Sequence, residues 1–75
     1  MNILASIQEK EVAIKGTIAD GFLAASIKNI GNDIAMVNGV SLAVGEAKSY
    51  PFVGKGYESI DYDPQNSRLR ILEIF

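Results

Sequence analysis

The side chains best suited to chemistry in this 75-residue chain are two aspartates, Asp61 and Asp63, which stand two positions apart. On a β-strand this spacing places both carboxylates on one face, as in a general acid–base pair or a pair of calcium ligands. The spacing to Gln65 is typical of a calcium loop, but the glycine and the closing glutamate of that loop are missing. We therefore predict that Asp61 and Asp63 are structural charges that pair with Arg70 and Arg68 on a neighbouring strand.

The remaining chemistry is limited because the sequence contains neither histidine nor cysteine. The commonest general base, the thiol nucleophile, disulfides and the usual zinc ligands are therefore absent. Tyr50, Tyr57 and Tyr62 are candidates for an aromatic surface that binds sugars or bases, although tyrosines at strand spacing more commonly lie half-buried with the hydroxyl at the rim. We predict no catalytic, cofactor-binding or metal-binding residue, and we do not expect an enzyme.

The charge distribution bears on possible partners. The formal net charge is −2 and the isoelectric point is about 4.9, with the charges scattered singly. A nucleic-acid surface is normally basic and clustered, so binding of nucleic acid through Arg68 and Arg70 is not expected. No apolar run approaches the roughly 20 residues of a membrane span, and residues 1–4 lack the basic start of a signal peptide. We expect a soluble protein made in the cytoplasm, without membrane contact.

These side chains must be positioned by short strands, because turn signals recur every eight to twelve residues and the intervening segments are rich in isoleucine and valine. The pattern predicts one all-β domain over residues 1–75, a small antiparallel sandwich or barrel of about six to seven strands. The predicted strands cover residues 3–7, 12–18, 22–30, 34–37, 40–44, 49–53 together with 57–62, and 68–75. Around residues 21–30 a short helix is an alternative, because an aspartate precedes the segment and a glycine ends it.

Asn38-Gly39 is the strongest local signal in the chain. Both central residues of a type I′ turn need positive φ, which asparagine and glycine tolerate. The two-residue loop sets Val37 opposite Val40. Both faces of the resulting hairpin are largely apolar, so we expect both to be covered, by the domain itself or by a neighbour. Pro51 places its own strand at a sheet edge or at a strand start.

A second hairpin is predicted at the C-terminus, with residues 64–67 as its loop. This register sets Asp63 against Arg68 and Asp61 against Arg70, so that opposite charges meet across the strands. A shift of one residue would separate both pairs.

The chain end is predicted to be an interface. Continuing the hairpin register would oppose Glu58 to Glu73, so we expect a bulge or the end of pairing near Leu72. Leu72, Ile74 and Phe75 then present apolar groups on both faces, and an unpaired apolar terminus promotes aggregation. We expect these residues to pair or pack, either within the domain or across a subunit boundary.

The size of the domain also favours association. A domain this small buries only roughly 60 % of its unfolded surface and is marginal without a disulfide, a metal or a partner. Because the sequence offers no cysteine or histidine, a partner chain is the remaining source of stability. We predict a homo-oligomer or a subunit of a larger assembly.

Residues 28–52, KNIGNDIAMVNGVSLAVGEAKSYPF, resemble small all-β accessory proteins of tailed-phage virions. The resemblance rests on a strand that ends at Asn29 and Gly31, the turn at 38–39, Leu42 and the pair at 45–46, with Val44 where proline often stands. It implies a capsid, tail or fibre part that associates with itself and with other virion proteins, without catalytic residues. The alternatives are a carbohydrate- or protein-binding β-sandwich and a small OB-like barrel that binds single-stranded nucleic acid.

Overall fold

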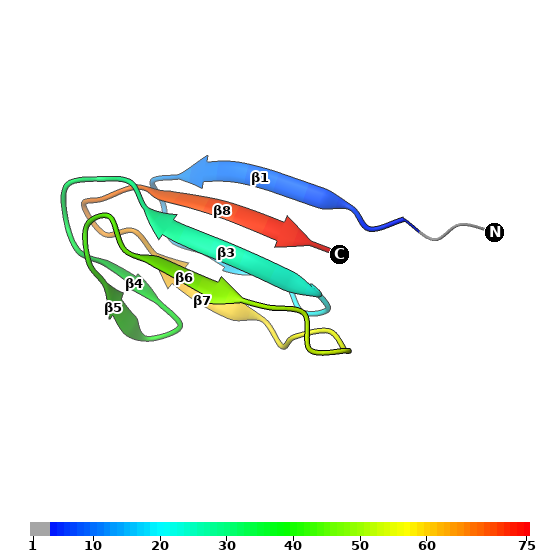
Figure 1. Ribbon diagram of the computed structural model, residues 1–75. Coiled ribbons are helices and arrows are strands. Elements are labelled where there is room, and N and C mark those ends of the chain that lie inside the picture. The colour runs from blue at the N-terminus through cyan, green and yellow to red at the C-terminus, as the bar shows by residue number, and fades with distance from the viewer. Residues whose placement is uncertain (1–3) are drawn as a thin grey trace.

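The computed structural model describes residues 4–75, which form eight β-strands in two four-stranded antiparallel sheets and no helix (Figure 1). The strands are β1 (Ile7–Val12), β2 (Gly16–Ile18), β3 (Ala24–Asn29), β4 (Ala35–Val37), β5 (Val40–Leu42), β6 (Ala47–Tyr50), β7 (Ile60–Asp63) and β8 (Leu69–Ile74). The all-β prediction is confirmed. The helical alternative for residues 21–30 is wrong, because β3 occupies that segment and alternates its side chains between the core and the surface.

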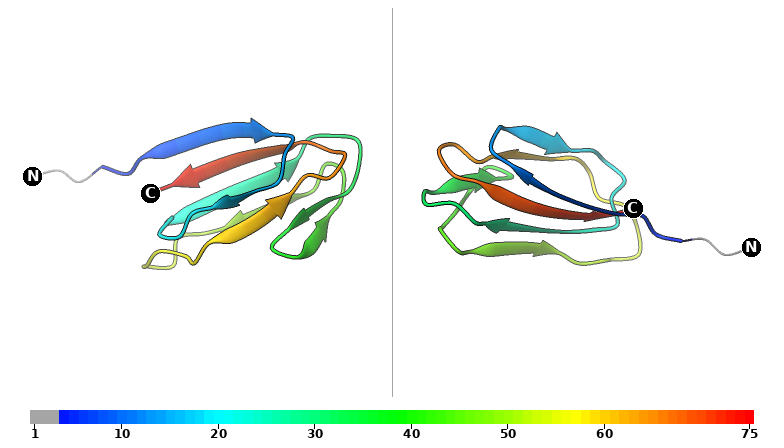
Figure 2. Two further views of the ribbon diagram at one scale, coloured as in Figure 1. Left: turned by 180° about the vertical axis from the view of Figure 1, so that it is seen from behind. Right: turned by 90° about the horizontal axis from the view of Figure 1, so that it is seen from above.

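The strand order defines a jelly roll. The first sheet has the order β1-β8-β3-β6 and the second sheet the order β2-β7-β4-β5. Strands therefore pair first with last, second with seventh, third with sixth and fourth with fifth, all antiparallel. A long antiparallel ribbon folded over itself gives this order, which is the double Greek key of jelly-roll domains. Figure 2 shows the two sheets as two layers, with β1 beginning and β8 ending at the same end of the molecule.

The core lies between the two sheets and is built by strand alternation. Along β8, for example, Leu69 and Ile71 are fully buried, whereas Arg70 is exposed. The buried hydrophobic side chains are Ile18, Phe22, Ala25, Ile27, Ala35, Val37, Leu42, Ile60, Tyr62, Leu69 and Ile71. Nearly all are branched aliphatic or aromatic residues, which fit the pleated surface of a sheet.

The predicted C-terminal hairpin is wrong. β7 pairs with β2 and β4, whereas β8 pairs with β1 and β3 in the other sheet, so Asp63 and Arg68, and Asp61 and Arg70, are not cross-strand pairs. The turn at 64–67 exists, with the Ser67 amide donating to the carbonyl of Pro64 at 2.9 Å, but it carries the chain between the sheets.

The bulge expected near Leu72 is also wrong. β8 keeps an unbroken register with both β1 and β3 from Leu69 to Ile74. Glu58 lies outside the strands, so the repulsion that was expected to end the pairing does not arise. Glu73 instead points inward, is 4 % exposed, and forms an ion pair of 3.6 Å with Lys10.

The β4–β5 hairpin has the predicted turn and register. Asn38 and Gly39 have φ values of 52° and 76°, and Val37 lies opposite Val40. Only one face packs on the core, through buried side chains that include Val37 and Leu42, and on the other face Ser41 is exposed. The domain itself therefore covers only one face of the hairpin, because β4 and β5 belong to one layer of a two-layer fold. That a neighbour covers the other face stays a prediction.

The remaining strand boundaries differ where the ribbon passes from one sheet to the other. The predicted strand at 3–7 begins outside the described residues. β1 starts at Ile7, which is the last residue of that predicted strand. The predicted strand at 12–18 is split between the sheets, and 49–53 together with 57–62 becomes β6 and β7 in different sheets. Pro51 follows β6, which is an edge strand, as its missing amide donor requires.

Asn29 joins the loops at one end of the sandwich. Its side chain is fully buried, and its amide nitrogen donates to the carbonyl oxygens of Asp33 at 2.7 Å and Leu42 at 2.9 Å. Its carbonyl oxygen accepts from the Gly31 amide at 3.1 Å and the Ser67 hydroxyl at 2.6 Å. Four polar groups from three separate segments are thus satisfied by one side chain.

Candidate assembly surface

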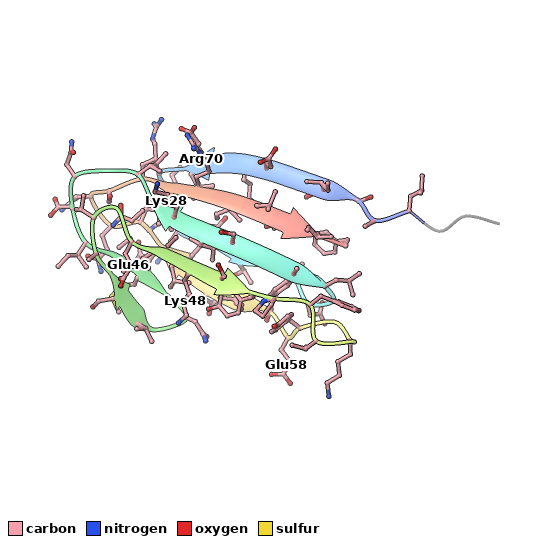
Figure 3. All side chains as sticks on the ribbon, in the orientation of Figure 1. Lys28, Glu46, Lys48, Glu58 and Arg70 are labelled. Atoms are coloured by element: carbon pink, nitrogen blue, oxygen red, sulfur yellow. The ribbon has the colours of Figure 1, made fainter. Side chains whose placement is uncertain are left out.

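The outward side of the first sheet is a surface that no other element of the described chain covers (Figure 1). Alternation along β1, β3, β6 and β8, combined with their register, assigns eleven side chains to it. We call this the outer face, and it consists of Ile7, Glu9, Glu11, Ala24, Ser26, Lys28, Ala47, Ser49, Arg70, Leu72 and Ile74. Figure 3 looks onto this surface, with Arg70 and Lys28 at one end of it.

The outer face is divided into rows by the cross-strand register. The charged row contains Glu11, Arg70 and Lys28 in that order from β1 to β3, followed by Ala47 on β6. At the opposite end, the apolar row places Ile74 between Ile7 and Ala24. The row between them, Glu9, Leu72, Ser26 and Ser49, is mixed.

The candidate interface residues divide between two environments. Leu72 and Ile74 lie on the outer face and are half-buried by their neighbours in the sheet. Phe75 instead packs against the core, and its amide and carbonyl exchange hydrogen bonds of 2.9 Å with Ser6. The chain end is thus paired within its own subunit, and two of the three apolar side chains remain available to a partner.

The electrostatics of the charged row depend on Glu11, which the sequence interpretation did not identify. Its carboxylate lies 3.4 Å from the Arg70 guanidinium and 3.6 Å from that of Arg68. Glu11 thus replaces Asp61 and Asp63 as the partner of both arginines. Pairing of the first strand with the last was not readable from the sequence, because residues 13–68 lie between β1 and β8 in the chain.

Lys28 lacks such a partner. It lies directly across from Arg70 in the register, and like charges in that position destabilise a sheet. Within residues 4–75 no carboxylate approaches the Lys28 ammonium to 4.0 Å or less. The outer face therefore has acidic side chains along β1 and an excess of positive charge along β8 and β3.

The free strand edges disfavour strand addition. β2 and β5 have three residues each, and β6 ends at a proline. On β1 the inward-pointing Lys10 lies 6.0 Å from the centre of the Tyr62 ring and pairs with Glu73. Short strands, proline and inward-pointing charges are the features that protect edges from pairing with another chain.

Asp61 and Asp63 lie on the outward side of the second sheet, beside an open depression of about 600 Å³ that Lys15, Thr17 and Met36 also line. Asp61 accepts a hydrogen bond of 2.8 Å from the Thr17 hydroxyl, and Asp63 accepts one of 2.9 Å from the backbone amide of Gln65. Among the described residues no three acidic side chains are grouped as a metal site would require. Both carboxylates thus stabilise local structure.

The three tyrosines do not form one surface, because only Tyr50 and Tyr57, both half-buried, line a common depression of about 560 Å³. Tyr62 is buried in the core. Tyr57 stacks on Phe22 with ring centres 4.9 Å apart, and Tyr50 packs edge-on against Tyr57 at 5.8 Å. The Tyr57 hydroxyl donates to the Pro51 carbonyl at 2.5 Å. The rings of Tyr50 and Tyr57 thus form a cluster around Phe22, in which Phe22 covers one face of the Tyr57 ring.

Comparison with protein-family models, with curated proteins and with solved structures gave no match. Within residues 4–75 there is likewise no helix of the length and apolar character that crossing a membrane requires. The fold and the chemistry of the outer face are therefore the basis for assigning a function.

Proposed function

We propose that this chain is a non-enzymatic structural module that assembles with copies of itself, as a capsid, tail or fibre component of a phage virion. The observation that carries the proposal is the composition of the outer face. Five of its eleven side chains are apolar: Ile7, Ala24, Ala47, Leu72 and Ile74. An antiparallel sheet with one solvated face normally carries polar side chains there, so the apolar row of Ile7, Ile74 and Ala24, with Leu72 beside it, favours a covering partner.

The fold supports the same class by analogy. Jelly rolls occur in viral capsid proteins, lectins and cupins. The chain has no histidine that could hold a metal ion, and the rings of Tyr50 and Tyr57 pack on each other and on Phe22. Of these three uses, the capsid type therefore has the most support. Because one fold serves many functions, the analogy adds to the surface chemistry and does not replace it.

The size of the outer face predicts weak pairwise association. Four strands about 4.8 Å apart, with lengths of up to six residues, give a face of about 400 Å². This is half of the about 800 Å² that each partner contributes to a standard interface. Weak contacts of this kind suit a particle component, because many copies held together by several contacts bind far more tightly than any one pair.

Light scattering coupled to size-exclusion chromatography tests the proposal on the purified chain. We expect a mass above the 8.1 kDa of one chain, increasing with the loaded concentration. A mass of one chain at every concentration would contradict self-assembly. The virion role has a separate test, since the genes that flank the gene for this chain should encode other virion components, and flanking genes for metabolism would argue against it.

A further inference from the structure

We infer that two copies of this chain pack face to face through their outer faces, about a two-fold axis that runs along β8. The inference rests on the proposed self-assembly and adds the surface, the partner and the orientation. The partner is a second copy of this chain, because Glu11 and Lys28 come opposite each other under this symmetry and the free edges are protected against strand addition.

The position of Lys28 gives the first argument. Lys28 lies beside Arg70 without a carboxylate partner, whereas Glu11 lies on the other side of Arg70, one strand away. A two-fold axis along β8 exchanges the positions of β1 and β3. It therefore sets Glu11 of each copy opposite Lys28 of the other, twice in each dimer, and supplies the missing partner.

The row pattern favours this axis over a two-fold axis perpendicular to the strands. An axis along β8 keeps each row over its own counterpart, so that Leu72 meets Leu72 and Ile74 meets Ile74 across the interface. Arg70 also meets Arg70, and each of these arginines keeps the ion pair with Glu11 of its own chain. An axis perpendicular to the strands would lay the charged row over the apolar row. Arg70 and Lys28 would then lose water without gaining acidic partners, which is strongly unfavourable.

Small side chains allow the close approach that this packing requires. Apart from Lys28, the half of the outer face that receives β1 of the second copy carries only small side chains: Ala24 and Ser26 on β3, and Ala47 and Ser49 on β6. Sheets that pack face to face lie about 10 Å apart, a distance that leucine and isoleucine fill from both sides.

The test uses two charge-reversed variants, Lys28→Glu and Glu11→Lys. Their association is measured by analytical ultracentrifugation from about 10 µM to about 500 µM, because a face of this size predicts weak association in that range. Each variant alone places like charges in both contacts and should weaken association about tenfold or more. An equimolar mixture restores two opposite-charge contacts, so a one-to-one heterodimer should form. Lys55→Glu and Glu58→Lys, exposed and outside the outer face, make the same charge changes as a control and should leave association unchanged.

A third variant guards against misfolding as an explanation. Ser26→Arg adds a bulky charge to the middle of the outer face without altering the core, so its unfolding temperature should stay close to that of the wild type while association is lost. If the wild type associates but Lys28→Glu and Ser26→Arg associate equally well, another surface is used and the inference is overturned. If the wild type itself remains a monomer, the proposed self-assembly fails with it.

Discussion

Replacing Asn29 by alanine should remove much of the stability of the fold. The change deletes all four hydrogen bonds of the side chain and leaves the Leu42 carbonyl and the Ser67 hydroxyl unsatisfied in buried surroundings. Each unsatisfied buried group costs about 1–3 kcal/mol, so we expect a loss of about 2–5 kcal/mol. A 75-residue domain has a total stability of about 4–11 kcal/mol, so the loss is a large fraction of it.

Thermal unfolding followed by circular dichroism measures this loss. At about 4–8 °C per kcal/mol for a domain of this size, a loss of about 3 kcal/mol lowers the midpoint by about 12–24 °C. Asn29→Asp distinguishes the contribution of the hydrogen bonds from that of packing. It keeps the shape of the side chain but turns a carboxylate oxygen toward the carbonyl oxygens of Asp33 and Leu42. It should therefore destabilise the fold more than Asn29→Ala does. Ser67→Ala removes only one of the four bonds and should cost about 1–2 kcal/mol.

The matched control is Asn32→Ala, an exposed asparagine in the same loop region, which should change stability by less than about 0.5 kcal/mol. If Asn29→Ala matched this control, or if Asn29→Asp were the milder change, Asn29 would not join the loops as described.

Two further predictions test the topology and a strained turn. Arg70→Asp replaces the ion pair with Glu11 by a repulsion and removes the repulsion with Lys28, so Glu11→Arg in the same molecule should raise the stability above that of the single variant by about 0.2–1 kcal/mol. Asp61→Arg in the Arg70→Asp variant should not restore stability. If denaturant unfolding showed that it does, the assignment of β7 and β8 to different sheets would be refuted. Gln65 has a φ of 56°, so Gln65→Gly should raise the unfolding free energy by about 0.5–1 kcal/mol, and a loss of stability would show that this turn is unstrained.

Features set by neighbouring residues could be predicted from the sequence. The hairpin at Asn38-Gly39 follows from the φ values that its two central residues tolerate, and its register follows from the length of the loop. The placement of Leu72 and Ile74 on one face follows from the two-residue period of a strand.

Features set by distant residues could not be predicted. The sequence of the turn at 64–67 is compatible with a hairpin and with a crossover between sheets, and only the pairing of β8 with β1 and β3 decides between them. For the same reason Glu11 was missed, because it became the partner of Arg70 only through the pairing of the first strand with the last. Asn29 reads as an ordinary turn residue until three separate segments converge on it.

Sedimentation equilibrium of the wild-type chain over a wide range of concentrations tests the central claim most directly. Self-assembly through the outer face predicts that the average mass rises from the 8.1 kDa of one chain toward twice that value as concentration increases. A mass that stays at one chain up to the highest concentration would mean that Leu72 and Ile74 remain in contact with water, and would contradict the account.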